Sequence, residues 1–389
     1  MVKYRRILLA CAAWVGGTLP LSAQDVKIGF LSTFTGPAAA IGQEQKNGFD
    51  LGVEHFGGKL GGLTPRILIG DDQLKSEIAL TIVDKWMNQD KVDIVVGPIW
   101  SNVILSIKDT VFKAGKILIS MNAGPNQLAG DQCNPLFFST SWNNEAWAEA
   151  AAEMANADGI KNMFVMLPNY QSGKDLLTAF QRHYKGAIVS TLMFKLNTMD
   201  FQAELSEIRA KKPEAAFVFA PAGMGIAFFK QWQAAGLNKD VKLLSVGTVD
   251  YLTVKGMGEG VVGTLFPSPF DHDAKNPVAR KFVAGFVAKH KRPPSYYAAQ
   301  SYDAAIVIDH GIKAVRGDLG KTKDMVLAIR GMRVEWTRGV VTFNSNHVPI
   351  TNWYKQTVAW KDNAPVINTQ SVVLQGRKDA YFEKCKMPY

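Results

Sequence analysis

The sequence is poor in cysteine and contains no long apolar run beyond its first residues. Three cysteines occur among 389 residues, and 47% of the residues are hydrophobic, which is ordinary globular composition. After the N-terminal segment, no stretch approaches the roughly 20 apolar residues that a transmembrane helix needs. The formal net charge is +10, but the lysines and arginines are scattered among acidic residues. This pattern is typical of a mixed surface, and we expect no nucleic-acid partner.

Motifs of the common enzyme classes are also absent. The sequence has no P-loop, no Gly-x-Gly-x-x-Gly after its first predicted strand and no Gly-x-Ser-x-Gly turn. The histidines show no metal-ligand spacing, so we expect no metal and no cofactor. Asp71 and Asp72 end a predicted strand, and we interpret them as loop-capping residues rather than as an acid–base pair. The sequence therefore predicts a protein that is not an enzyme.

The first 23 residues have the pattern of a secretory signal peptide. Lys3, Arg5 and Arg6 form a basic start, residues 7–21 are nearly all apolar or small, and Ala23 provides a small residue for cleavage. We therefore expect export to the periplasm.

The cysteines have two different roles in this interpretation. Cys11 follows a short apolar run that resembles a lipobox, which leaves lipidation open as an alternative to cleavage. Cys133 and Cys385 remain after export and predict a disulfide, with two unpaired thiols as the alternative. Such a long-range bond would stabilise the fold by about 4–5 kcal/mol in the chain-entropy model.

Strand and helix signals alternate in two successive series. The first series predicts strands at 26–31, 65–70, 92–98 and 117–120 and helices at 42–55, 76–89 and 102–114. The second predicts strands at 162–167, 187–192, 215–220, 241–246 and 260–266. It predicts helices at 147–157, 173–184, 201–211, 276–289 and 300–315, and one more that follows the strand 215–220 and ends at 235. Short apolar runs separated by amphipathic stretches are typical of βαβ units. The fold class is therefore α/β, with two doubly wound lobes.

Ligands of open α/β sheets bind beyond the carboxyl ends of the strands, so the loops after the strands hold the candidate site. The loops that follow the predicted strands are 32–39, 98–102, 121–124, 168–171, 221–225 and 247–251. They are rich in glycine, proline, asparagine, serine and aromatic residues and contain few ionisable groups. That composition favours binding over catalysis.

With these loops in view, the chain resembles the branched-chain amino acid class of periplasmic binding proteins of ABC transporters, the type 1 fold. The segments that carry the resemblance are 26–37, Asp71-Asp72, Val96-Gly97-Pro98 with Ser101, 233–237 and 339–343. The resemblance implies two Rossmann-like lobes joined by three crossovers, near Ser141, Phe270 and Ser345. Lobe 1 would comprise residues 24–141 and 271–345, and lobe 2 residues 142–270 and 346–389. It also implies a monomer that closes on a small molecule by hinge motion and delivers it to an ABC permease.

In this family a serine hydroxyl and backbone N–H groups hold the carboxylate of an amino acid. The matching serine is Ser101, with Trp100 and Asn102 beside it; its alternative role is to cap the helix that follows. The second loop departs from the family, because Asn122-Ala123-Gly124 replaces a stretch that ends in threonine. Asn122 is the candidate replacement donor.

A second departure concerns the ligand's ammonium group. The family places a glutamate where this chain has Gly247 or Thr248, and Asp250 lies two or three residues further on. Because a buried ammonium without a carboxylate is costly, either Asp250 takes that role or the ligand has no ammonium, and we favour the second.

Aromatic residues in or near the loops suit a flat apolar ligand with a polar end. They are Trp100, Trp142, Tyr170, Tyr251 and Tyr297. All of these except Tyr251 belong to the candidate site, which Ala222 and Thr248 complete. The resemblance extends to relatives that bind benzoate or phenylpropenoate acids, so we expect an aromatic acid. The alternatives are a branched-chain amino acid or amide binder that uses Asp250, and a periplasmic sensor subunit.

Overall fold

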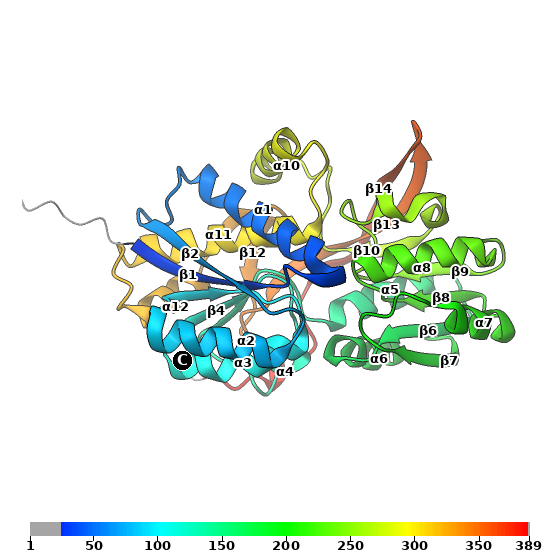
Figure 1. The fold of residues 1–389 in the computed structure, drawn as a ribbon, viewed down its shortest axis with the longest axis horizontal. Coiled ribbons are helices and arrows are strands. Elements are labelled where there is room, and N and C mark those ends of the chain that lie inside the picture. The colour runs from blue at the N-terminus through cyan, green and yellow to red at the C-terminus, as the bar shows by residue number, and fades with distance from the viewer. Residues whose placement is uncertain (1–24, 388–389) are drawn as a thin grey trace, which may run out of the picture.

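The computed structural model describes residues 25–387 as two α/β lobes that lie side by side (Figure 1). The first lobe contains the N-terminal segments, in blue and cyan, together with later helices in yellow, and the second contains the green segments. The predicted signal peptide and Cys11 lie outside the described residues. Within the described range no helix is both long and apolar enough to cross a bilayer.

The first lobe is built on a parallel five-stranded sheet with strand order β2-β1-β3-β4-β5. Its strands are β1 (Asp25–Ser32), β2 (Thr64–Asp71), β3 (Ile94–Val96), β4 (Ile117–Ser120) and β5 (Phe137–Ser139). Its helices are α1 (Ala39–His55), α2 (Ser76–Lys85), α3 (Ser101–Lys113), α4 (Asn126–Ala129), α10 (Pro277–His290), α11 (Tyr296–Ala314) and α12 (Thr322–Arg330). Ile28 pairs with Ile67 and Ile94 on either side, as expected for a sheet whose two faces are covered by helices.

The close packing of α1 against α11 brings a late segment of the chain into the first lobe. A Cβ atom on Gly48 of α1 would lie 2.1 Å from the carbonyl oxygen of Ala298, so only glycine permits this approach. Helix α11 is buried nearly all round, which fits a helix inside a domain core. Its first turn carries Tyr297 to the boundary between the lobes.

The second lobe repeats the architecture with strand order β7-β6-β8-β9-β10, all parallel. Its strands are β6 (Asn162–Pro168), β7 (Ala187–Phe194), β8 (Ala215–Val218), β9 (Lys242–Ser245) and β10 (Leu265–Ser268). Its helices are α5 (Glu145–Ala157), α6 (Gln171–His183), α7 (Gln202–Lys211), α8 (Gly223–Ala234) and α9 (Val254–Met257). In both lobes the strand order reverses beside the first strand, which is where doubly wound sheets bind ligands.

The chain passes between the lobes from β5 to α5, from β10 to α10, and from β12 (Gly339–Phe343) to β13 (Pro349–Lys361). The buried Arg338, between β11 (Val334–Trp336) and β12, connects the first of these passages to α11. Its guanidinium donates to the carbonyl oxygens of Thr140 and Ser141 and pairs with Asp303 of α11 at 3.2 Å. Burial raises the pKa of Asp303 to about 6 in spite of Arg338.

The α/β fold class predicted from the sequence is confirmed, with differences in single elements. The predicted strand 260–266 is wrong in its first half: residues Gly258–Val261 form a 3₁₀ turn, and β10 begins at Leu265. Gly263, inside the predicted strand, has a φ of 79°, which a strand does not accommodate. The helix predicted from residue 300 begins at Tyr296, because the Ser295 side chain accepts the N–H of Ala298. The predicted lobe boundaries stay a prediction.

A long C-terminal hairpin was not predicted. β13 pairs antiparallel with β10 and with β14 (Ala364–Arg377), which extends the sheet of the second lobe. The turn residues Asp362 and Asn363 have φ values of 51° and 59°, as a two-residue hairpin turn requires.

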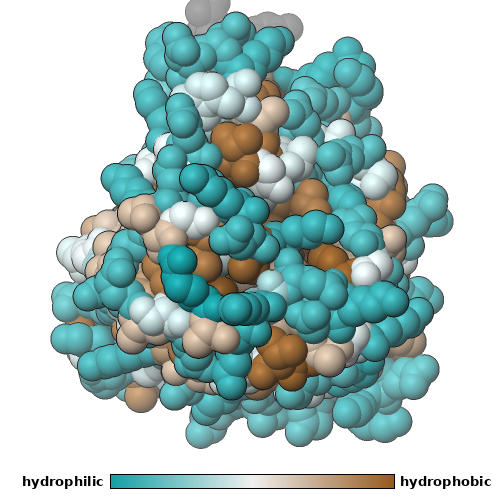
Figure 2. All heavy atoms as spheres, turned by 90° about the vertical axis from the view of Figure 1, so that its right-hand side faces the viewer, coloured by the Kyte–Doolittle hydropathy of each residue, from teal (hydrophilic) through white to brown (hydrophobic). Residues whose placement is uncertain are grey.

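The predicted disulfide between Cys133 and Cys385 is confirmed, with a Cα–Cα distance of 5.6 Å. It ties the C-terminal segment to the loop before β5 in the first lobe. Figure 2 views the molecule from the end of the second lobe and shows a mainly hydrophilic surface, with hydrophobic areas separated by polar side chains.

Candidate ligand-binding site

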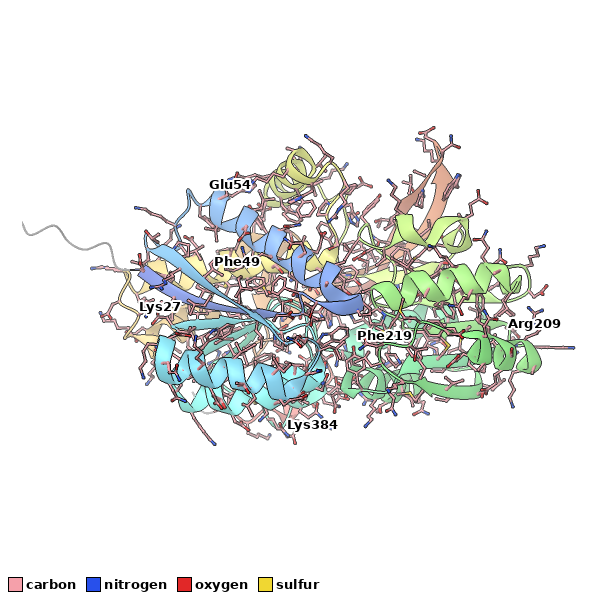
Figure 3. The ribbon with its side chains drawn as sticks, in the orientation of Figure 1. Lys27, Phe49, Glu54, Arg209, Phe219 and Lys384 are labelled. Atoms are coloured by element: carbon pink, nitrogen blue, oxygen red, sulfur yellow. A yellow bond between two sulfur atoms is a disulfide. The ribbon has the colours of Figure 1, made fainter. Side chains whose placement is uncertain are left out.

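A small cavity lies between the lobes, where the loops after the strands face each other. Its lining residues are Ile99, Ser101, Asn122, Ala123, Trp142, Asn144, Trp147, Tyr170, Ser172, Leu176, Phe219, Val246, Gly247 and Tyr297. Phe219, labelled in Figure 3, lies at the junction of the two lobes. Within the described chain, these lining residues include no carboxylate, ammonium, guanidinium or imidazole group.

The wall from the first lobe is organised around the start of α3. The helix begins at Ser101, and the first N–H that bonds back within it is that of Ile104, which donates to Trp100 at 3.0 Å. The preceding backbone N–H groups have no partner inside the helix and give this end partial positive charge. Ser101 therefore occupies the first helical position, and the capping position belongs to Trp100, whose side chain does not cap.

The Ser101 hydroxyl is free to donate a hydrogen bond. Its oxygen accepts from the side-chain amide of Asn144 at 3.1 Å. Among residues 25–387, no acceptor takes its proton. Ser101 is 2% exposed and lines the cavity, so a ligand oxygen can be that acceptor. The Trp100 indole lies behind this wall, where it donates to Thr33 at 2.8 Å.

The loop after β4 forms the second part of this wall. Asn122 donates from its side-chain nitrogen to the carbonyl oxygen of Ile99 at 2.7 Å, while its side-chain oxygen is buried without a partner. Ala123 lines the cavity beside it. Gly124 has a packing role, because a Cβ atom there would lie 2.3 Å from the carbonyl oxygen of Trp142.

Aromatic rings form much of the remaining wall. Trp142 and Trp147 meet edge to face with ring centroids 5.0 Å apart. Tyr170 of the second lobe lies 5.8 Å from Trp100 and 6.3 Å from Phe219, again measured between ring centroids. Such rings offer apolar faces and positive edges to a flat ligand.

The tyrosines of the cavity are neutral hydrogen-bonding groups. Burial raises the pKa of Tyr170, against a smaller opposing effect from its hydrogen bond with Ser172. Burial likewise raises the pKa of Tyr297, whose hydroxyl donates to the carbonyl oxygen of Gly247 across the lobes at a long 3.5 Å. Both side chains can therefore donate a proton without carrying charge at neutral pH.

Asp250 and Thr248 lie outside the cavity lining. The Thr248 hydroxyl accepts from Ala220 at 3.0 Å and donates to Val246 at 2.8 Å. One carboxylate oxygen of Asp250 accepts the N–H groups of Leu252 at 2.8 Å and of Thr253, while its other oxygen is buried without a partner. Burial, reinforced by the charge of Glu44, raises the pKa of Asp250 to about 7. Asp250 thus holds its own turn in this structure.

Half of the predicted site residues line the cavity. Those that do are Ser101, Asn122, Ala123, Trp142, Tyr170 and Tyr297; those that do not are Trp100, Asn102, Gly124, Ala222, Thr248 and Asp250. Asn102 donates to Ser76 at 3.2 Å, and Ala222 precedes α8 with a φ of 54°. Ile99 and Gly247 line the cavity from two of the predicted loops, although neither was singled out, and sequence reasoning missed Asn144, Trp147, Ser172, Leu176, Phe219 and Val246. The position of 143–147 directly after the first crossover was the available signal for two of them.

Two groups of acidic residues have structural explanations. Asp71 accepts the N–H groups of Phe34 and Gln73, which confirms its predicted loop-capping role. Glu145, Glu149 and His183 lie close enough to bring their ligand atoms within 4.8 Å of one another. However, Glu145 pairs with Arg182 at 2.7 Å and Glu149 with Arg377. These guanidiniums balance the two carboxylates, and we assign no metal.

The two lobes are in contact and enclose a small cavity whose lining residues carry no charge. This arrangement is typical of a ligand-binding protein. The family model described as "Periplasmic binding protein" matches residues 25–364, and the chain belongs to this family. It is thus a solute-binding protein of the ABC-transporter type and not an enzyme, as the sequence predicted.

The chain is similar to an ABC-transporter solute-binding protein from R. palustris, solved in complex with benzoate. That structure has 26% identity and a TM-score of 0.89 and covers 93% of this chain and 100% of that one. The Leu/Ile/Val-binding protein homolog 6 of Brucella melitensis is 24% identical, covering 92% of this chain and 93% of that protein. The leucine-, isoleucine-, valine-, threonine-, and alanine-binding protein of Pseudomonas aeruginosa is 26% identical, covering 88% and 92%.

Proposed function

We propose that this protein captures a small aromatic carboxylate of the benzoate or phenylpropenoate type in the inter-lobe cavity and delivers it to an ABC permease. The observation that carries the proposal is the absence of a carboxylate among the lining residues of the described chain. An amino acid would bury an ammonium group there without a counter-charge, which is costly. An aromatic acid presents a carboxylate to the start of α3 and a ring to the aromatic wall.

The anion end of the ligand fits the first-lobe wall. The free N–H groups at the start of α3 and the hydroxyl of Ser101 are donors that need no cationic side chain to hold a carboxylate. The ring end fits Trp147, Tyr170 and Phe219, which supply apolar contact. The R. palustris protein solved with benzoate supports the same ligand class for a chain of closely similar fold.

A branched-chain amino acid is the second candidate, supported by the partner-free carboxylate oxygen of Asp250 and by the name of the P. aeruginosa relative. It requires the loop of Asp250 to turn that oxygen toward the cavity. In that case Asp250→Ala abolishes leucine binding while the fold stays intact.

Isothermal titration of the mature protein tests the proposal. The panel is benzoate, 4-hydroxybenzoate, 4-hydroxycinnamate, leucine and isoleucine, with benzamide as a control without the anion and cyclohexanecarboxylate as a control without the aromatic ring. We expect binding of at least one aromatic acid that exceeds binding of both controls. Binding of leucine or isoleucine alone would defeat the proposal.

The cellular setting follows from the same proposal. We propose cleavage after residue 23, a periplasmic location, a monomeric state and an ABC permease as partner. Co-purification with a permease, rather than with a membrane receptor kinase, distinguishes transport from a sensor role.

A further inference from the structure

Asp175 is a buried carboxylate at the boundary of the lobes that is not part of the cavity lining. It lies on α6 of the second lobe and is 6% exposed. Its oxygens accept from the side chains of Asn144 at 2.8 Å and Gln171 at 2.9 Å and from the backbone N–H of Asn126 at 3.3 Å. It makes no ion pair with a cationic side chain in the described range. A carboxylate buried among neutral donors costs stability, so its position calls for an explanation.

The partner of Asp175 closest to the cavity is Asn144, whose side-chain nitrogen makes two hydrogen bonds. One N–H donates to Asp175 and the other to the hydroxyl oxygen of Ser101 at 3.1 Å. An ionised carboxylate only accepts hydrogen bonds, so Asp175 fixes which end of the Asn144 amide faces it. The nitrogen then also faces Ser101, and Ser101 must accept. The proton of Ser101 is thereby directed away from Asn144.

We propose that Asp175 is a positioning residue that acts through Asn144 to turn the hydroxyl proton of Ser101 toward the carboxylate of the ligand. The inference rests on the proposed function, because it takes the ligand to be an anion bound at Ser101. Without Asp175 the Asn144 amide can rotate by half a turn. Its oxygen then accepts the proton of Ser101, and the ligand loses a donor.

The three residues come from different parts of the molecule. Ser101 belongs to the first lobe, Asn144 follows the first crossover and Asp175 belongs to the second lobe. Asp175 also accepts the N–H of Asn126, which is again in the first lobe. The arrangement is complete only when the lobes touch, so closure itself prepares the anion site.

A double-mutant cycle tests the coupling. Benzoate affinity is measured by titration for the wild type, Asp175→Asn, Ser101→Ala and the double variant. We expect about a tenfold loss for Asp175→Asn, at the lower end of what a lost hydrogen bond to a charged group costs. The double variant should be no more than about twofold weaker than Ser101→Ala. Fully additive losses, or an unchanged affinity in Asp175→Asn, would overturn the proposal.

Asp309→Asn is the matched control. Asp309 is also 6% exposed, but it accepts from Gly61 and pairs with Lys313 away from the cavity. We expect a lower melting temperature and an unchanged benzoate affinity for this variant. Equal losses of affinity in Asp309→Asn and Asp175→Asn would reduce Asp175 to a general stability effect and overturn the proposal.

An exchange variant separates positioning from support of the fold, and decides alone if Asp175→Asn does not fold. In Asp175→Asn/Asn144→Asp, the new asparagine donates to the new aspartate and the net charge is kept. The new carboxylate beside Ser101 accepts its proton, so we expect a recovered melting temperature without recovered benzoate binding. Recovery of both would show a purely structural role.

The proposed function and this inference can fail separately. If the wild type binds leucine and not benzoate, the proposed function fails, and the same cycle run with leucine decides the role of Asp175, since leucine also presents a carboxylate. If the wild type binds benzoate and the losses are additive, only the inference fails. A wild type that binds neither overturns both.

Discussion

The two walls of the cavity differ in the chemistry that they present. The first lobe contributes the start of α3 and the loop after β4, with the donor Ser101 and the partner-free oxygen of Asn122. The second lobe contributes Leu176, Phe219 and Val246, together with the neutral phenol of Tyr170. One wall is equipped to orient a polar group, and the other to cover an apolar body.

This division shows how one fold can exchange ligands. The polar group of the ligand is held by backbone N–H groups at the start of a helix that follows a strand. Every doubly wound fold can provide such groups. In the opposite wall, side chains such as Phe219 and Val246 follow strands β8 and β9 and can be replaced without disturbing the sheet. We therefore expect changes in the first wall to affect the affinity for every acid, and changes in the second to affect the choice among acids.

The largest loss of affinity is expected from Ser101→Ala, which removes the only side-chain hydroxyl at the start of α3. Loss of a hydrogen bond to a carboxylate corresponds to about 1.5–3 kcal/mol, or about 10–150-fold in the dissociation constant for benzoate. Titration calorimetry measures it. Ser106→Ala on the same helix is the control, because Ser106 donates to the carbonyl oxygen of Val103. Equal effects of the two substitutions would contradict the assignment of the anchor.

A smaller loss is expected from Phe219→Leu in the second wall. Leucine keeps an apolar side chain but removes the ring that faces Tyr170 and the cavity. An aromatic contact adds about 0.5–1.5 kcal/mol beyond its buried area, so benzoate affinity should fall about 2–12-fold. The affinity for cyclohexanecarboxylate should change less, and a parallel loss for both acids would argue against ring-specific contact.

No loss of benzoate affinity is expected from Asp250→Asn, which instead changes stability. The pKa of Asp250 lies at about 7 in the folded state against 3.8 as the reference value. The folded protein therefore holds a proton that the unfolded chain releases, and the stabilisation present below about pH 4 is lost as the pH rises through 7. At pH 8, Asp250→Asn should be more stable by about 2–4 kcal/mol, an order-of-magnitude value.

Urea unfolding at pH 5 and pH 8 checks this prediction. The stability difference between the variant and the wild type should grow with pH. The exposed Asp240 provides the control substitution, Asp240→Asn, which should show no such growth. Lost benzoate binding in Asp250→Asn would instead place this carboxylate in the site.

The sequence predicted the two α/β lobes because strand and helix signals are local, and it predicted the disulfide because only two cysteines follow the predicted signal peptide. Apolar strands such as 162–167, and a pair of cysteines in a chain expected to be exported, have few alternatives. The hairpin β13–β14 was missed although its Asp362-Asn363 turn is a local signal; only its pairing with β10 joins segments far apart in the chain. Ser101 and Tyr170 were found because they follow strands. Trp147 was missed because it lies on α5, and Asn144 because it directly precedes that helix; only the tertiary fold turns this part of the chain toward the cavity.

Asp250 illustrates what sequence position alone does not decide. Its distance from the family's glutamate position left open whether it faces the ligand. One of its oxygens accepts the N–H groups of Leu252 and Thr253. This local turn competes with a ligand for the same carboxylate. Side-chain direction in such a loop depends on hydrogen bonds that residue spacing does not reveal.

Gly223 at the start of α8 lies against Pro37 of the opposite lobe, and a Cβ atom there would sit 3.1 Å from the Pro37 carbonyl oxygen. A ligand held between the lobes can leave only when the lobes separate at this contact. Its residence time therefore depends on how often Gly223 and Pro37 move apart. A bulky residue at position 223 would prevent the lobes from closing fully. The cavity would still bind its ligand, but the ligand would dissociate quickly. A variant with such fast dissociation would bind the ligand but would deliver less of it to the proposed permease.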